Sequence, residues 1–289
     1  MAEELPLPPL AAPLPPIVSG GPRTAMRALL VAIAALVSGA TLAGLGVLAF
    51  GIADSRIVTH TQALPADMQL LTIDTGEVPV AVRIVADDSA TEPRVDLRMV
   101  TRADGPPPAV ITDSGSSRVT LGDAASGFLS YIGTGELTVV LPPDVARGLR
   151  VTVNHRTGPL TTDADLDHLV ANVDDGTVTL GGSARVIDVE VRHGDISTNA
   201  RIAVSETFRA TAETGSISME FRAAPRTTEA IARGNVTVGL PGSEPYRVRA
   251  ETDMPHGVTT VTVPETADPS APGLTALSKS GNVKVIELG

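Results

Sequence analysis

The chain has 289 residues, of which 43% are hydrophobic but only 2% aromatic, and it contains neither tryptophan nor cysteine. The missing cysteine excludes disulfides, thiolate metal sites and cysteine nucleophiles, and the scarcity of aromatic residues predicts a core of Val, Ile, Leu, Ala and Thr. Residues 1–60 carry three acidic and three basic side chains, so the net charge of −11 belongs to the remainder. An acidic body repels phosphate backbones, and we expect no nucleic-acid partner.

Residues 1–26 are rich in proline, and the tetrapeptide PLPP occurs twice, at residues 6–9 and 13–16. Proline fixes the backbone φ angle and has no amide hydrogen to donate, so the segment is not expected to join a helix or a sheet. We predict a disordered or polyproline II tail. Such a tail could dock in an aromatic groove of a cytoplasmic partner.

A long uncharged run lies between Arg27 and Asp54. Because about 20 helical residues cross the hydrocarbon layer of a bilayer, the run predicts a transmembrane helix over residues 27–53. A cleaved signal peptide is the alternative, but its apolar region would be shorter and nearer to the start. Arg23 and Arg27 precede the run and one arginine follows it, which predicts a cytoplasmic N-terminus. The expected localisation is therefore the cell membrane, with one pass and an extracytoplasmic C-terminal domain.

Glycines recur at nearly constant intervals in the second half of the chain. The regular series is Gly158, Gly176, Gly194, Gly215 and Gly234, and a further copy lies at Gly281. Two positions after each glycine stands an apolar residue, and the next residue in five copies carries a hydroxyl group: Thr161, Thr179, Ser197, Ser218 and Thr237. This alternation predicts strands with one buried face, separated by glycine turns. A period of about 20 residues indicates a repeat architecture.

One such unit has too little apolar area to fold alone, so we predict that the units stack. The predicted fold class is all-β, with a β-solenoid over residues 141–289 in which each strand-turn-strand unit is one coil and equivalent strands are parallel. A sandwich of antiparallel hairpins is the alternative. Only Asp175–Gly176 has the residue pair typical of two-residue hairpin turns, which favours the solenoid. Residues 54–140 are less regular and are predicted to form an N-terminal β region that caps the repeats.

The segments TGEVPVAV, VDDGTVTLGG, HGDISTN, ETGSISME and KSGNVKVIEL carry the repeat most clearly. Together with the predicted membrane anchor, they resemble a bacterial β-strand-repeat family that is labelled "putative adhesin" and has no known function. The resemblance covers roughly residues 68–289. It implies an extracytoplasmic β-solenoid tethered to the cell envelope, and it implies no established activity.

Three side chains near the turns are candidates for a binding site. Asp175 precedes one turn glycine and Asp195 follows the next, and stacking would bring them together beside His193. Two carboxylates a few ångströms apart could act as acid and base on a glycosidic bond. Aspartate is also an ordinary turn residue, and the equivalent positions in other units hold Thr, Ser and Asn. We therefore assign no catalytic residue and retain Asp175, His193 and Asp195 as weak binding candidates.

The segment DADLDHLVANVD, residues 163–174, superficially matches a calcium loop. The sixth position of such a loop needs glycine for a sharp turn, and here it is His168. The histidines lack the spacing of zinc ligands, and the chain has no phosphate-binding or dinucleotide-binding motif. We expect no metal and no cofactor.

These observations predict a non-enzymatic, adhesin-like binding or scaffolding protein of the cell envelope, anchored by a single membrane pass. Its expected partner is a cell-envelope component or a membrane protein. Two alternatives stay open. One is a polysaccharide-active β-helix enzyme, and the other is an accessory or sensor subunit of a membrane complex.

Overall fold

The structure is a computed structural model that describes residues 55–102, 109–113, 115–121 and 135–289, together with residues 30, 31, 33, 37 and 41. The chain divides into two compact units, Met1–Ala53 and Asp54–Gly289. The five described residues of the first unit are helical. The described residues of the second unit form nineteen strands and one short helix.

The prediction of a transmembrane helix over residues 27–53 is not supported. Within the part of the chain that the structure describes, no helix is both long enough and apolar enough to cross a bilayer. Most of this segment, and all of the proline-rich tail, lies outside the described residues. The single-pass localisation, with a cytoplasmic N-terminus and an extracytoplasmic domain, is corrected accordingly.

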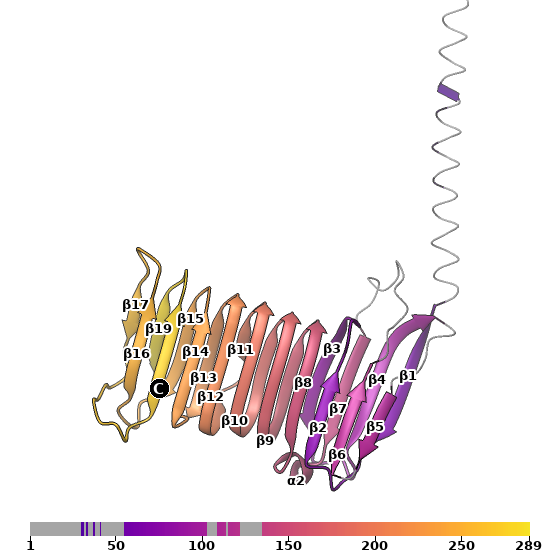
Figure 1. Cartoon of the computed structure of the whole chain (residues 1–289), viewed down its shortest axis with the longest axis horizontal. Helices are drawn as coiled ribbons and strands as arrows, with labels where there is room; N and C mark the ends of the chain where they lie inside the picture. The colour runs from indigo at the N-terminus through magenta and orange to yellow at the C-terminus, as the bar shows by residue number, and fades with distance from the viewer. Residues whose placement is uncertain are drawn as a thin grey trace, which may run out of the picture. The chain divides into compact units, whose positions relative to one another are not determined.

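Figure 1 shows the strands of the second unit side by side, with one short helix, α2, at Pro143–Ala146. The first strands are β1 Ser55–Ala63, β2 Leu70–Asp74, β3 Val80–Ala86, β4 Arg94–Arg102, β5 Ala109–Asp113, β6 Ser116–Thr120 and β7 Gly135–Leu141. The middle strands are β8 Arg150–Thr157, β9 Leu160–Asp175, β10 Val178–His193, β11 Ile196–Thr198, β12 Ile202–Thr214 and β13 Ile217–Ala223. The last are β14 Thr227–Ala232, β15 Val236–Pro241, β16 Arg247–Thr252, β17 Thr259–Val261, β18 Gly273–Ser278 and β19 Val283–Leu288.

The predicted alternation of buried and open side chains is confirmed in the repeat strands. In β8, Val151, Val153 and His155 are buried while the residues between them are half-buried or exposed. The same alternation runs along β9, β10 and β12. Successive side chains of a strand point to opposite faces, so each repeat buries one row of small apolar residues and leaves a polar row open.

The spacing of the repeats sets the register of the sheet. Strand β10 pairs in parallel with β9 on one side, where Val178 lies opposite Leu160, and with β12 on the other, where Ile187 lies opposite Phe208. These offsets along the chain equal the intervals between successive turn glycines, so equivalent positions of neighbouring units lie side by side. All strand pairs from β8 onward are parallel. The hairpin alternative for the repeats is therefore wrong.

The prediction of a β-solenoid is also wrong. Two strands that follow each other in a repeat, such as β16 and β17, form one layer of the sheet, and the order of these layers in space differs from their order along the chain. In a solenoid each coil stacks between the coils that precede and follow it. Here β2 pairs with both β6 and β8, so an early strand lies between two later ones. At the other end, β18 pairs with β14 and β16, and β19 pairs with β15 and β17. The last strands of the chain thus lie inside the sheet, and the β16–β17 layer lies at its end (Figure 1).

The N-terminal strands depart further from a uniform stack. Strand β1 pairs with β4, β4 with β7, and β5 with β6, and all three pairs are antiparallel. The described strands consequently form one sheet of nineteen strands with mixed direction. Residues outside the repeat pattern make these pairs, which is why the glycine spacing did not predict them.

The core is a narrow row of aliphatic side chains, as the composition predicted. Val, Ile, Leu and Ala supply most of its buried positions. One aromatic pair is included, because Phe208 and Phe221 meet edge to face with ring centroids 5.1 Å apart. Each of these two side chains is fully buried.

Candidate functional site

A shallow groove lies where strands β9, β10 and β12 bend, and a β-bulge shapes it. Ala184 of β10 pairs with Val204 of β12, and Val186 pairs with Thr207. Two residues of β12 therefore face the single Arg185. An extra residue on one strand locally disrupts the ladder and re-aims the side chains around it.

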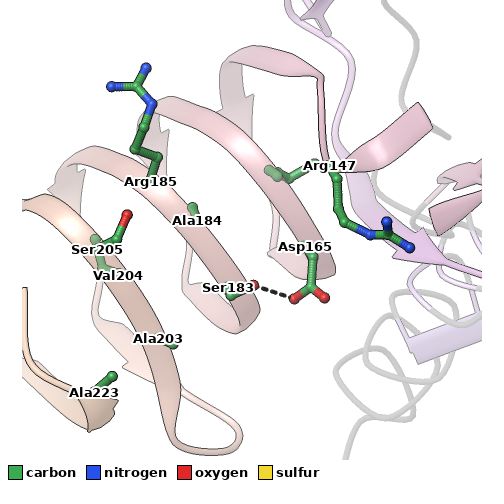
Figure 2. Close-up of a pocket in the computed structure, with 10 residues that line it drawn as sticks. Arg147, Asp165, Ser183, Ala184, Arg185, Ala203, Val204, Ser205 and Ala223 are labelled. Atoms are coloured by element: carbon green, nitrogen blue, oxygen red, sulfur yellow. Dashed lines mark hydrogen bonds between the residues drawn. The ribbon is translucent and has the colours of Figure 1, made fainter. Parts of the chain in front are cut away.

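The groove has a volume of about 310 Å³ and combines small apolar side chains with polar ones. Its lining includes Leu166, Ala184, Ala203, Val204 and Ala223 together with Arg147, Asp165, Ser183, Arg185 and Ser205. Figure 2 shows the Ser183 hydroxyl turned toward the Asp165 carboxylate. Ser183 Oγ donates to Asp165 Oδ1 over 2.5 Å. Small side chains keep the groove open.

Arg185 connects three layers of the sheet through ion pairs. Its Nε donates to Asp167 Oδ1 over 2.9 Å, and its Nη1 donates to Glu206 Oε2 over 2.8 Å. Arg150 contacts the other oxygen of Asp167 at 3.4 Å. Positive and negative side chains therefore alternate across four neighbouring strands, in the order Arg150 of β8, Asp167 of β9, Arg185 of β10 and Glu206 of β12.

These contacts favour the charged forms of Asp167 and Arg185. The hydrogen bond from Arg185 lowers the pKa of Asp167, and the nearby Arg150 acts in the same direction. Hydrogen bonds to Asp167 and Glu206 raise the pKa of Arg185. A carboxylate held by two arginines is a poor proton acceptor, since its charged form is the stabilised one. The arrangement is thus suited to holding strands and presenting fixed charge rather than to proton transfer.

Sequence reasoning missed the Arg185 cluster, although the signal was present. The interval from Asp167 to Arg185 is the same as that from Gly158 to Gly176, and their strands are paired in that register. Applying the period to charged residues as well as to glycines would have placed the two side chains opposite each other.

The structure brings two of the three predicted binding candidates together. His193 Nδ1 lies 3.4 Å from Asp175 Oδ1, and their side chains are 55% and 62% exposed. Asp195 has a different partner, because its Oδ1 accepts a hydrogen bond from the Ser216 amide over 2.7 Å. That contact joins one turn to the next. None of these three residues lines the groove.

The segment that resembles a calcium loop is part of the extended strand β9. Asp165 is bound by Ser183, and Asp167 by Arg185, so both carboxylates are engaged with neighbouring strands. Among the described residues, no group of three or more His, Cys, Asp or Glu side chains has a geometry that could hold a metal ion.

A row of hydroxyl side chains runs across the strands three residues after each turn glycine, on the side that does not face the core. Residue pairing places Thr161, Thr179, Ser197, Ser218 and Thr237 in adjacent strands, each opposite the next. We call these five residues the hydroxyl row. Neighbouring strands are about 4.8 Å apart, so the row is about 19 Å long. Its side chains are half-buried or exposed, and within the described residues none of the five hydroxyl groups makes a hydrogen bond to another side chain or to the backbone.

No protein-family model matches the sequence, and no curated protein matches it. Solved structures similar to the chain include a "putative cell adhesion protein" from Clostridium sporogenes, with 12% identity and a TM-score of 0.40 over 81% of this chain and 100% of that one. A "putative adhesin" from Bacteroides fragilis has 14% identity and a TM-score of 0.38, over 81% of this chain and 97% of that one. A "putative adhesin" from Parabacteroides merdae has 11% identity and a TM-score of 0.43, over 80% of this chain and 97% of that one. Membership of the strand-repeat family stays a prediction.

Proposed function

We propose that the chain is a non-enzymatic, adhesin-like binding or scaffolding protein that holds an extended partner along the hydroxyl row. The observation that carries this proposal is the row itself. Five hydroxyl groups are repeated at the strand spacing, they are accessible, and the described part of the protein leaves them without internal partners.

Repetition is what gives such a row its binding capacity. A single serine or threonine contributes one donor and two acceptor lone pairs, and one exchanged hydrogen bond contributes little net free energy. Several contacts on one rigid sheet act together, because the first contact brings the others to a high effective concentration. A polymer with regularly spaced polar groups fits this arrangement. The partner class we propose is a cell-envelope polymer or a membrane protein with such a repeat.

The guanidinium groups of Arg185 and Arg209 are less available. Arg185 is held by Asp167 and Glu206, and Arg209 by Glu229 at 3.0 Å. These ion pairs occupy the groups that would otherwise attract a charged partner. The hydroxyl row is therefore the better candidate for contact with a polar, uncharged polymer.

The test is binding of the full chain to an array of bacterial polysaccharides and matrix proteins. The variant Thr179→Ala/Ser197→Ala/Ser218→Ala removes the centre of the row, and we expect at least a tenfold loss of affinity. The matched control, Thr152→Ala/Thr211→Ala/Thr275→Ala, removes three half-buried threonines outside the row and should bind normally. Failure to bind any arrayed polymer, or equal binding by both variants, would contradict the proposal.

The polysaccharide-active alternative makes a different prediction. If Asp175 and Asp195 were an acid and base pair, Asp175→Asn/Asp195→Asn would abolish release of reducing sugar from an arrayed polysaccharide. A binding protein releases none, with or without these carboxylates. The sensor alternative depends on the tail within residues 1–22, which lies outside the described residues.

A further inference from the structure

The β16–β17 layer ends the sheet and leaves one edge of β16 open. Among the described strands, β16 pairs only with β18, and β17 only with β19. Figure 1 shows both at one end of the row of strands. An open strand edge presents unpaired amide and carbonyl groups that can pair with another chain.

Burial confirms that β16 lacks a neighbour on its outer side. Val248, Ala250 and Thr252 are opposite Leu274, Ala276 and Ser278 of β18, and the three residues of β18 are buried. Their counterparts in β16 are only half-buried. The adjoining loop adds two exposed apolar side chains, since Met254 is 40% and Val258 is 58% exposed. The end of the core is thus incompletely covered.

Hydrogen bonding shows which residues of β16 face outward. The amides of Arg247 and Asp253 donate to Pro272 and Ser278, on the β18 side. The amide of Tyr246 donates to Pro264, on the other side. Successive amides of a strand alternate in direction, so those of Val248, Ala250 and Thr252 point away from β18. The loop at Pro264 covers the edge only beside Tyr246, where Tyr246 and Glu265 form an isolated bridge.

We propose that two copies of the chain associate by antiparallel pairing of their β16 strands, centred on Ala250. Ala250 would then face its own equivalent in a hydrogen-bonded pair, and Val248 would face Thr252 of the partner subunit. This two-fold arrangement extends both sheets and covers the half-buried ends of both cores.

The charge pattern of β16 selects this register. Pairing centred on Ala250 sets Arg249 opposite Glu251 of the partner subunit and Arg247 opposite Asp253 of the partner subunit. Centring on Arg249 would instead oppose two arginines, and centring on Glu251 would oppose two glutamates. If one β16 strand slipped by a single residue along the other, polar side chains would lie against the core. Opposite charges across an antiparallel pair are stabilising, and like charges are destabilising.

The proposal is tested on the full chain by sedimentation velocity over a range of concentrations. Wild type should form a dimer. Arg249→Glu and Glu251→Arg, each alone, place like charges opposite each other and should give monomers. An equimolar mixture of these two variants restores opposite charges across the interface and should give a heterodimer. The double variant Arg249→Glu/Glu251→Arg should dimerise again.

Ala250→Pro supplies a second, independent test. Its amide points away from β18, so proline there leaves the internal ladder intact but removes a donor from the outer edge. We expect a folded monomer, with circular dichroism unchanged. A wild-type monomer at high micromolar concentration would overturn the proposal. Dimers that persist in the single charge variants and in Ala250→Pro would also overturn it.

Discussion

Gly194 lies directly on Gly176 in the stack of turns, with no room for a side chain between them. A Cβ atom on Gly194 would collide with the carbonyl oxygen of Gly176, and Gly194 also has a φ angle of 144°, which L side chains rarely adopt. Gly215 lies on Gly194 in the same way. The repeated glycines are therefore required by the close approach of successive turns, and not only by the turn conformation.

Gly194→Ala should strongly destabilise the second unit. The new methyl group must displace the neighbouring backbone while the residue keeps an unfavourable φ, and we expect a loss of at least about 2–3 kcal/mol. Gly148→Ala is the control, because nothing lies closer than 4.0 Å to its added Cβ. Urea denaturation followed by circular dichroism measures both. Equal stability of the two variants would show that the turns can separate without cost.

Arg185→Gln should lower the denaturation midpoint more than Arg83→Gln does. Arg185 makes close contacts with both Asp167 and Glu206, whereas Arg83 lies 4.0 Å from Glu136 and both of these side chains are about half exposed. Exposed ion pairs contribute little and are screened by salt. The difference between the variants should shrink at high salt. A difference that is independent of salt would assign the effect of Arg185 to packing.

Stability should fall on mild acidification because of His155. This side chain is buried, its Nδ1 lies 3.0 Å from Thr75 Oγ1, and its Nε2 has no hydrogen-bond partner among the described residues. Burial lowers the pKa of His155 below its ordinary value of 6.5, and the Gly158 backbone opposes that shift only in part.

The unfolded chain consequently binds more protons than the folded one below pH 6.5, so stability is complete above that value and declines as the pH falls toward the folded pKa. His155→Gln should flatten this decline below pH 6.5. His193→Asn, a change at an exposed histidine, should retain it. The pH dependence of the urea midpoint distinguishes these outcomes, and an unchanged slope in His155→Gln would assign it to other groups.

The phenol of Tyr246 should lose its proton at a higher pH than an ordinary tyrosine. It is buried, and its hydroxyl donates to the Pro241 carbonyl over 2.5 Å. Burial, reinforced by Glu244 and Glu287, raises the pKa of Tyr246 to about 12. The folded state then keeps the proton that the unfolded state loses near pH 10, so this contribution to stability is present below pH 10 and is lost as the pH rises through 12.

Tyr246→Phe removes the hydroxyl and leaves the Pro241 carbonyl without that donor, which should cost about 0.5–1.5 kcal/mol. The chain has only two tyrosines, so ultraviolet titration resolves the change. The late-titrating half of the tyrosinate signal should vanish in the variant. A single early transition in wild type would contradict the burial of this phenol.

The sequence alone determined the repeated strand. The alternation around Gly176 and Gly194 predicted which side chains are buried, and the interval between these glycines predicted which residues lie side by side, as the pairing of Val178 with Leu160 confirms. The reason is local, because a strand and a tight turn are specified by residues within one unit. The candidate contact of His193 with Asp175 followed from the same spacing.

Only the tertiary structure decided the order of the layers. The pattern of one unit does not encode which other unit it pairs with, since all units present similar backbone edges. The chain inserts β2–β3 between the consecutive pairs β6–β7 and β8–β9, and it inserts β18–β19 between the consecutive pairs β14–β15 and β16–β17. The open edge of β16 also follows from this order, and the bulge at Arg185 arises in the pairing of β10 with β12. They depend on contacts between units, and a periodic sequence specifies such contacts only weakly.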